Sequence, residues 1–145
     1  MRVSGLVSQT IDVKRSVRQG GVLSTFLYLV YINDLLDELE SSGYGSKVMS
    51  VCTGNPAFAD DISLLALTPS HLQRLVDIVH TFCLHWNVSV NVEKSRITVF
   101  TKRRAQSSAC IRYGDQVIKQ TASFVHLGIS YCFNTKIKDI ISCRL

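Results

Sequence analysis

The stretch K-V-M-S-V-C-T-G-N-P-A-F-A-D-D-I-S-L-L-A-L, residues 47–67, decides the fold because it surrounds two adjacent aspartates with β-branched and apolar residues. This pattern predicts a β-hairpin with residues 58–61 at its tip. Charges between apolar strands are costly unless they are paired or bound to a cation. Since neighbouring strand residues point to opposite faces, only a turn lets Asp60 and Asp61 approach one ion. Mg²⁺ suits such a carboxylate pair, and a solvated acidic turn is the open alternative.

Helices are predicted on both sides of this hairpin. Ser24 and Thr25 are good N-caps for a helix over residues 26–39, and Gly43 is a suitable stop. The first half of this segment is apolar nearly all round, so we expect it to be buried on several sides. A second helix is expected after Pro69, where apolar residues recur at helical spacing: Leu72, Leu75, Val76, Val79, Phe82, Cys83 and Trp86.

Short strands are expected in the rest of the chain. They cover residues 3–7 and 11–14 as a pair, residues 88–90 and 97–100 around a turn at 91–95, a hairpin at 111–113 and 116–118, and residues 124–129. Gly114-Asp115 is typical of a two-residue hairpin turn. Because no internal repeat or low-complexity linker interrupts these elements, we treat the chain as one unit.

The composition is that of an ordinary globular chain. Of the 145 residues, 46% are apolar and 19% are charged, which excludes a wholly disordered, collagen-like or coiled-coil chain. The formal net charge of +5 is a mild bias toward phosphate-bearing partners. Net charge alone does not distinguish nucleic-acid binding from an ordinary basic surface.

Targeting and cysteine patterns limit the cellular setting. The longest uncharged apolar run, residues 22–33, is too short to span a bilayer, and no signal-peptide pattern opens the chain. We therefore expect an intracellular protein, nuclear or cytoplasmic, that is not secreted and has no membrane partner. The five cysteines include no C-x-x-C pair, so neither a disulfide framework nor a zinc knuckle is indicated.

Four sequence blocks, in order, resemble the reverse transcriptase of non-LTR (LINE-type) retrotransposons. They are Arg18-Gln19-Gly20 with Leu23-Ser24 and Tyr31-Ile32-Asn33-Asp34-Leu35, then Phe58-Ala59-Asp60-Asp61, Asn91-Val92-Glu93-Lys94-Ser95, and Phe124-Val125-His126-Leu127-Gly128. The blocks are similar to the family's R-Q-G-x-x-L-S-P, Y-A-D-D, N-x-x-K-S and F-x-Y-L-G segments. Departures from them include Thr25 for proline, Phe58 for tyrosine and His126 for tyrosine.

The resemblance implies an α+β fold, a partial polymerase palm in which an antiparallel sheet is backed by helices. Residues 1–129 would form the palm domain, and residues 130–145 would start the connection to the thumb. The implied activity is RNA-directed DNA polymerisation for retrotransposition, a nucleotidyl transfer that uses Mg²⁺. The implied partners are an RNA template, a DNA primer and deoxynucleoside triphosphates.

The same resemblance assigns roles to individual residues. Asp60 would bind the metal ion, and Asp61 would support the metal site from beside it. Lys94 would lie near the triphosphate and protonate the departing pyrophosphate. The implied contacts to substrate and nucleic acid are Arg18, Gln19, Gly20, Phe58, Leu127 and Gly128.

One further carboxylate is expected in this family. The block that supplies it should lie well before Arg18, and Asp12 lacks the apolar surroundings of that block. Because two-metal phosphoryl transfer loses its clamp without this carboxylate, we expect the chain to be inactive on its own. The alternative is a non-catalytic retroelement remnant or repurposed palm fragment that binds nucleic acid or a protein partner.

Other chemistry-bearing residues have simpler interpretations. Three potential metal ligands lie close in sequence, but no second cluster completes a site: His80, Cys83 and His85. Phe82 and Trp86 keep the register of the apolar stripe, so we expect them in the core rather than as base-stacking platforms. The basic run at residues 102–104 is either a solvated loop or a phosphate contact.

Overall fold

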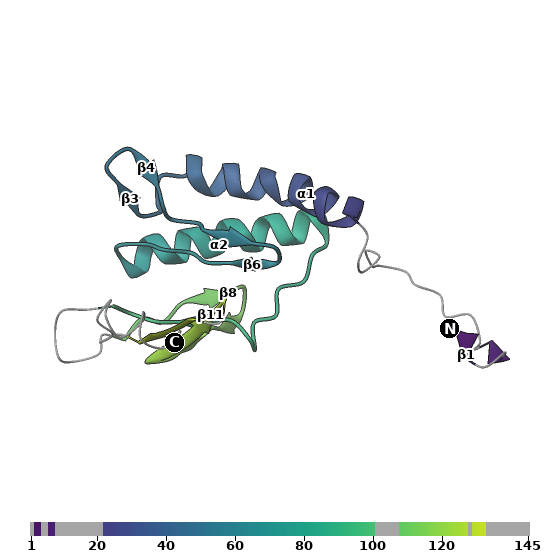
Figure 1. Ribbon diagram of the computed structural model, residues 1–145. Helices are drawn as coiled ribbons and strands as arrows, with labels where there is room; N and C mark the ends of the chain where they lie inside the picture. The colour runs from purple at the N-terminus through teal and green to yellow at the C-terminus, as the bar shows by residue number, and fades with distance from the viewer. Residues whose placement is uncertain (1, 4–5, 8–21, 101–107, 128, 133–145) are drawn as a thin grey trace.

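The structure is a computed structural model that describes residues 2–3, 6–7, 22–100, 108–127 and 129–132. These residues form two helices and several short two-stranded sheets, so the chain is of the α+β class. Figure 1 shows α1 and α2 side by side, with the β8 and β11 region on the other side of α2. The second helix therefore lies at the centre of the described part of the chain.

Helix α1 spans Val22–Ser41 and is longer than predicted. Ser24 and Thr25 are not its caps, because the helix already runs through both. The predicted stop is confirmed by Gly43, whose φ of +74° is the left-handed conformation that often ends a helix. The N–H of Gly43 donates to the carbonyl oxygen of Glu40 at 3.5 Å.

The predicted burial of the first half of α1 is wrong. Although Tyr28 is half-buried, five apolar side chains of this half are at least half exposed: Leu23, Phe26, Leu27, Leu29 and Val30. The contact with α2 instead uses Ile32, Leu35 and Leu39, which are 5%, 1% and 1% exposed. An all-round apolar sequence does not itself provide a packing partner, and the described elements cover mainly the second half of this helix.

Helix α2 spans Pro69–Trp86, as its amphipathic spacing predicts. The Thr68 hydroxyl accepts the N–H of His71 at 3.2 Å, and proline occupies the first turn where its missing N–H costs nothing. Asn87 ends the helix in the left-handed conformation. Phe82 is buried as predicted, but Trp86 is 46% exposed and packs edge-on against Tyr31, so its predicted place in the core is wrong.

Two apolar clusters hold α2 from opposite sides. The first joins α2 to α1 and contains Ile32, Leu35, Leu39, Leu75, Phe82 and Cys83. The second joins α2 to the later strands and contains Val76, Ile97, Ala109, Ile111 and Ile118. Because burying a Leu or Ile side chain is worth about 1.5–3 kcal/mol, these clusters stabilise the arrangement of the helices and strands.

The strands pair locally, with one parallel exception. The antiparallel pairs are β1 Arg2–Val3 with β2 Leu6–Val7, β3 Lys47–Val48 with β4 Val51–Cys52, β5 Ala57–Phe58 with β6 Asp61–Ile62, β8 Arg112–Tyr113 with β9 Gln116–Val117, and β11 Ser123–His126 with β12 Ile129–Cys132. The parallel pair is β7 Arg96–Ile97 with β10 Lys119–Gln120. The hairpin on Gly114-Asp115 is confirmed.

Several strand predictions need correction. Residues 47–67 hold two hairpins rather than one, and residues 88–90 form no strand. The predicted last strand at 124–129 contains the turn of a hairpin, because the chain reverses between β11 and β12. At the start of the chain the pair lies within residues 2–7, and residues 11–14 are outside the described residues.

Gly45 and Gly54 allow the backbone before β3 and the backbone after β4 to touch, next to the β5–β6 hairpin that carries the two aspartates. A Cβ on Gly54 would lie 2.5 Å from the Cα of Gly45, a distance that no side chain tolerates. The N–H of Leu65 donates to Gly54 at 2.6 Å, and the N–H of Ser63 donates to the carbonyl of Pro56 at 2.9 Å. Pairing therefore continues past proline, whose carbonyl remains available although it has no N–H.

The described cysteines and helices bear on the sequence expectations about disulfides and membrane spans. Cys52, Cys83 and Cys110 are free thiols in the structure. Neither helix in the described part of the chain combines the length and apolar character needed to cross a membrane.

Candidate active site

The acidic pair lies at the tip of the β5–β6 hairpin, as predicted. Ala59 and Asp60 form the two-residue turn, and Asp61 is the first residue of β6, where it pairs with Phe58. Ala59 has a φ of 51°, a left-handed conformation that favours glycine. The hairpin thus places Asp60 and Asp61 at consecutive positions, and both residues are exposed.

Both aspartates are exposed, which corrects the expectation of charges enclosed by apolar strands. No described residue forms an ion pair or hydrogen bond with either carboxylate. Mg²⁺ is usually held by one or two carboxylates together with waters and substrate phosphates, so this donor pair fits part of a magnesium shell. Among the described residues, no group of three acids, histidines or cysteines could complete a protein-only metal site.

A tyrosine on α1 lies near the turn. Burial raises the pKa of Tyr28, and the negative charge of Asp60 raises it further. Tyr28 is half-buried and packs against the same apolar cluster as Ile62 of β6. The sequence analysis did not identify this residue, although it lies in the helix that follows the Arg18-Gln19-Gly20 block.

Lys94 lies in a tight turn built by its own sequence block. The N–H of Lys94 donates to the Asn91 side-chain oxygen at 3.0 Å, and the Ser95 hydroxyl donates to the Asn91 carbonyl at 2.9 Å. These bonds explain why the block contains asparagine and serine around the lysine. The Lys94 side chain is exposed, and no described residue bonds to its ammonium group.

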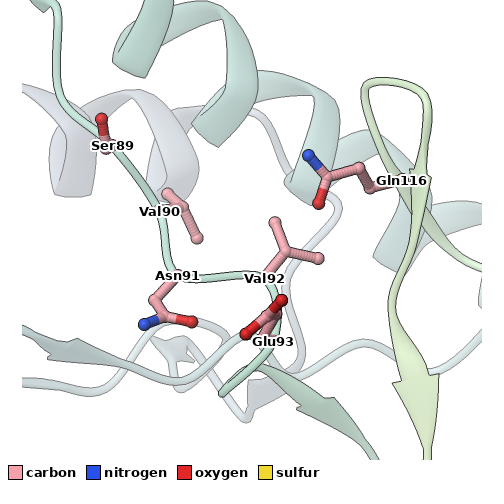
Figure 2. Close-up of a pocket in the computed structure, with 6 residues that line it drawn as sticks. All are labelled: Ser89, Val90, Asn91, Val92, Glu93 and Gln116. Atoms are coloured by element: carbon pink, nitrogen blue, oxygen red, sulfur yellow. The ribbon is translucent and has the colours of Figure 1, made fainter.

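An open hollow adjoins this turn. It has a volume of about 460 Å³ and is lined by Ser89, Val90, Asn91, Val92, Glu93 and Gln116. Figure 2 shows Val90, Val92 and Gln116 directed toward the same space, with Gln116 reaching it from the β8–β9 hairpin. The sequence analysis did not predict this hollow, because it depends on two segments that are far apart in the chain.

The last of the four sequence blocks, residues 124–128, lies in the β11–β12 hairpin. Leu127 lies in its turn with a φ of 52° and is 47% exposed. The Nε2 of His126 lies 3.4 Å from the hydroxyl of Ser63, the residue that follows β6, and this contact links the two hairpins. Of the other predicted contact residues, Phe58 is 63% exposed on β5. Arg18, Gln19, Gly20 and Gly128 lie outside the described residues.

The three potential metal ligands on α2 have other contacts. Cys83 is buried and interacts with the Tyr113 hydroxyl, and burial raises the pKa of its thiol. His80 packs edge-on against Tyr113 with ring centroids 4.7 Å apart, whereas His85 packs against Trp86. The basic run at residues 102–104 lies outside the described residues.

The chain is similar in sequence to a known protein family and to known proteins. Residues 2–131 match the profile of a family described as reverse transcriptase (RNA-dependent DNA polymerase). The chain is 27% identical over 135 residues to the RNA-directed DNA polymerase from mobile element jockey of Drosophila melanogaster. The matched region covers 88% of this chain and 14% of that protein. It is 28% identical over 143 residues to the Retrovirus-related Pol polyprotein from type-2 retrotransposable element R2DM of Drosophila melanogaster, covering 92% of this chain and 13% of that protein.

The chain therefore spans only a small part of the length of these relatives. No solved structure matched the chain. The family profile nevertheless covers most of its residues, and the predicted resemblance is confirmed. The chain belongs to the reverse transcriptase (RNA-dependent DNA polymerase) family, and the relatives that it matches are polymerases of non-LTR retrotransposons.

Proposed function

We propose that this chain is part of the palm of an RNA-directed DNA polymerase that copies RNA into DNA for retrotransposition. The observation that carries the proposal is the hairpin that presents Asp60 and Asp61, adjacent and exposed, within a chain of the reverse transcriptase family. The α+β arrangement of helices and antiparallel hairpins is compatible with a palm. The partners proposed are an RNA template, a DNA primer and deoxynucleoside triphosphates.

The proposed metal site uses the acidic tip. Asp60 would hold Mg²⁺ with a carboxylate oxygen, and Asp61 would support the site from the next position in the chain. When bound, the ion would supply charge stabilisation for transfer of the nucleotidyl group.

The other proposed roles follow from the resemblance of the sequence blocks to those of the family. Lys94 would donate a proton from its ammonium group to the departing pyrophosphate, and the hydrogen bonds of Asn91 would fix the backbone that carries it. Phe58 would pack near the primer end, and Leu127 with Gly128 would grip the primer strand. Arg18, Gln19 and Gly20 would contact the incoming nucleotide and the template.

We also propose that the 145-residue polypeptide does not polymerise DNA by itself. The described residues bring together two carboxylates, and no third potential metal ligand joins them. Two-metal transfer needs a clamp on both the attacking and the leaving oxygen, which this pair alone supplies only in part. Activity therefore requires a longer protein in which this chain is one segment.

The test is a chimera in which residues 2–131 replace the matching segment of the jockey polymerase. Primer extension on an RNA template with Mg²⁺ should be lost in Asp60→Asn. Asp115→Asn is a matched control, because Asp115 is also the second residue of an exposed two-residue hairpin turn. The control should retain the activity of the unmodified chimera.

A different result would reject the assignment. If Asp60→Asn extends primers as well as Asp115→Asn does, the acidic hairpin is not the metal site. If the chimera is folded and binds primer and template but no version extends a primer, the non-catalytic alternative is favoured. Extension by the 145-residue polypeptide alone, above its own Asp60→Asn variant, would contradict the proposed need for a longer protein.

A further inference from the structure

Two cations lie side by side on the parallel strand pair. Lys119 of β10 is the register partner of Arg96 of β7, and both side chains are exposed. Partners in adjacent strands share one face of the sheet, and like charges placed opposite each other are destabilising. No described residue forms an ion pair with either side chain. An anion bound at this position would remove the repulsion.

The Arg96 side chain is held in place by the turn before it. Its Nη1 donates to the carbonyl oxygen of Ser95 at 2.7 Å and also to that of Glu93. A guanidinium group that is already oriented loses less conformational freedom when it binds a ligand. Arg96 is therefore better prepared for an anion than a freely rotating surface cation.

The two cations line one end of a groove. A smaller hollow of about 260 Å³ is lined by Arg96, Lys119, Val92, Glu93, Gln116 and Val117. It shares Val92, Glu93 and Gln116 with the hollow of about 460 Å³ in Figure 2, so the two form one continuous surface. Small molecules prefer enclosed sites that bury most of their surface, whereas an open groove suits an extended strand.

Charge is distributed unevenly over the described elements. On α1 every charged residue is an acid: Asp34, Asp37, Glu38 and Glu40. The described residues from 88 to 120 contain more cations than acids: Lys94, Arg96, Arg112 and Lys119 against Glu93 and Asp115. The groove therefore lies in the basic part of the structure, although the Glu93 carboxylate within it opposes an anion.

We propose that the groove between residues 89–96 and 116–119 binds the phosphodiester backbone of a nucleic-acid strand through Arg96 and Lys119. The contact is independent of base sequence, because it uses cations and a backbone phosphate. It shares with the proposed function only the expectation of a nucleic-acid ligand. It requires neither Asp60 nor a metal ion, so its test is separate from the test of polymerisation.

The experiment measures binding of the full chain to a labelled single-stranded RNA by fluorescence anisotropy, without metal or nucleotide, between about 50 and 200 mM salt. The test variant is Arg96→Gln with Lys119→Gln. The matched control is Lys47→Gln with Arg74→Gln, which removes the same charge from exposed positions on β3 and α2. Arg96→Lys keeps the charge, and circular dichroism checks that each variant is folded.

The test pair should lower the slope of log K against log salt by about 1–1.5, since each single-strand phosphate contact contributes about 0.7. The control pair should change the slope less. Arg96→Lys should weaken binding less than Arg96→Gln does, and Glu93→Gln should tighten binding by removing repulsion. Equal weakening by the two pairs, or binding that does not depend on salt, would overturn the proposal. Displacement of the RNA by micromolar deoxynucleoside triphosphate would overturn it in favour of a nucleotide site.

Discussion

The hydroxyl of Ser63 lies 3.4 Å from the Nε2 of His126, although the two residues are 63 positions apart in the chain. Ser63 follows the acidic pair by two residues, and His126 directly precedes Leu127. The contact therefore connects the hairpin proposed to hold the metal ion with the hairpin proposed to grip the primer. A displacement of one hairpin would alter the position of the other.

This contact predicts energetic coupling between the two hairpins. We expect Ser63→Ala and His126→Phe each to lower the free energy of unfolding, and the double variant to lose about 0.5–1.5 kcal/mol less than the sum. Urea unfolding of the four proteins measures this difference. Ser123→Ala, an exposed change in the same strand as His126, should be additive with Ser63→Ala. Additivity of Ser63→Ala with His126→Phe would show that the contact contributes nothing.

A glycine at the β8–β9 turn predicts a second effect on stability. A Cβ on Gly114 would lie 3.0 Å from the Nε2 of His80, and Gly114 has a φ of +57°. Gly43 has a φ of +74° with no atom within 4 Å of such a Cβ, so it is a control for the backbone alone. We expect Gly43→Ala to cost about 1–2 kcal/mol and Gly114→Ala about 1 kcal/mol more.

The extra cost at Gly114 should depend on His80. In a His80→Ala background, Gly114→Ala and Gly43→Ala should lower the free energy of unfolding by the same amount, because the imidazole is no longer in the way. Chemical denaturation measures both backgrounds. An excess cost at Gly114 that persists without His80 would place the strain in the backbone instead.

The contact between Cys83 and Tyr113 predicts lower stability in alkaline solution. Burial raises the pKa of the Cys83 thiol above its ordinary value of 9.0, and it also raises the pKa of Tyr113. The folded state therefore keeps protons that the unfolded state releases. This stabilisation is fully present below about pH 9 and is lost as the pH rises further.

Urea unfolding between neutral pH and about pH 10.5 measures this dependence. Cys83→Ala should make the free energy of unfolding fall less steeply with pH, although it lowers stability at neutral pH by removing a core side chain. Cys110→Ala is the control, because Cys110 is an exposed free thiol, and it should leave the slope unchanged. An identical slope in both variants would remove Cys83 from the explanation.

The turn around Lys94 predicts a hierarchy of activities in the jockey chimera. Lys94→Ala should slow primer extension by about 10²–10⁴-fold without abolishing it, because a lost general acid reduces the rate while the metal site remains. Asn91→Ala should slow it less, through a looser turn. Asn91→Asp should keep the rate of the unmodified chimera, because a carboxylate oxygen can accept the backbone N–H of Lys94 in the same way.

Single-turnover kinetics measures this series at saturating nucleotide. A positioning role for Asn91 predicts a change in the rate of the chemical step with little change in nucleotide affinity. A loss of affinity alone, or a rate for Lys94→Ala equal to that of the unmodified chimera, would contradict the assigned roles. Asp61→Asn should have a smaller effect than Asp60→Asn.

Local sequence patterns predicted the elements that depend only on residues close together in the chain. The spacing of Leu72, Leu75 and Phe82 identified α2, and the adjacent Asp60 and Asp61 identified a hairpin tip. The start of α1 was not predictable from Ser24, because a residue that caps a helix well is also tolerated within its first turns. The turn at Leu127 was missed because a leucine with positive φ is uncommon.

The rest of the site depends on pairs that no local pattern reveals. Ser63 with His126 and Arg96 with Lys119 are each brought together by pairing between distant segments. The predicted burial of Phe26 was also wrong, because this side chain is 62% exposed. Its apolar character shows that burial would be favourable, but it does not show which segment could cover it. Distant contacts of this kind required the structure.

The parallel pairing of β7 with β10 has a consequence for the order of folding. Hairpins with two-residue turns, such as β5–β6 and β8–β9, close locally, on a timescale of about 1–10 μs. Residues 96 and 119 instead meet only after the intervening chain has closed a long loop, which delays their pairing relative to the hairpins. We therefore expect the Arg96–Lys119 pair to assemble after these hairpins, so a newly made chain would acquire its acidic tip before it acquires the proposed phosphate-binding groove.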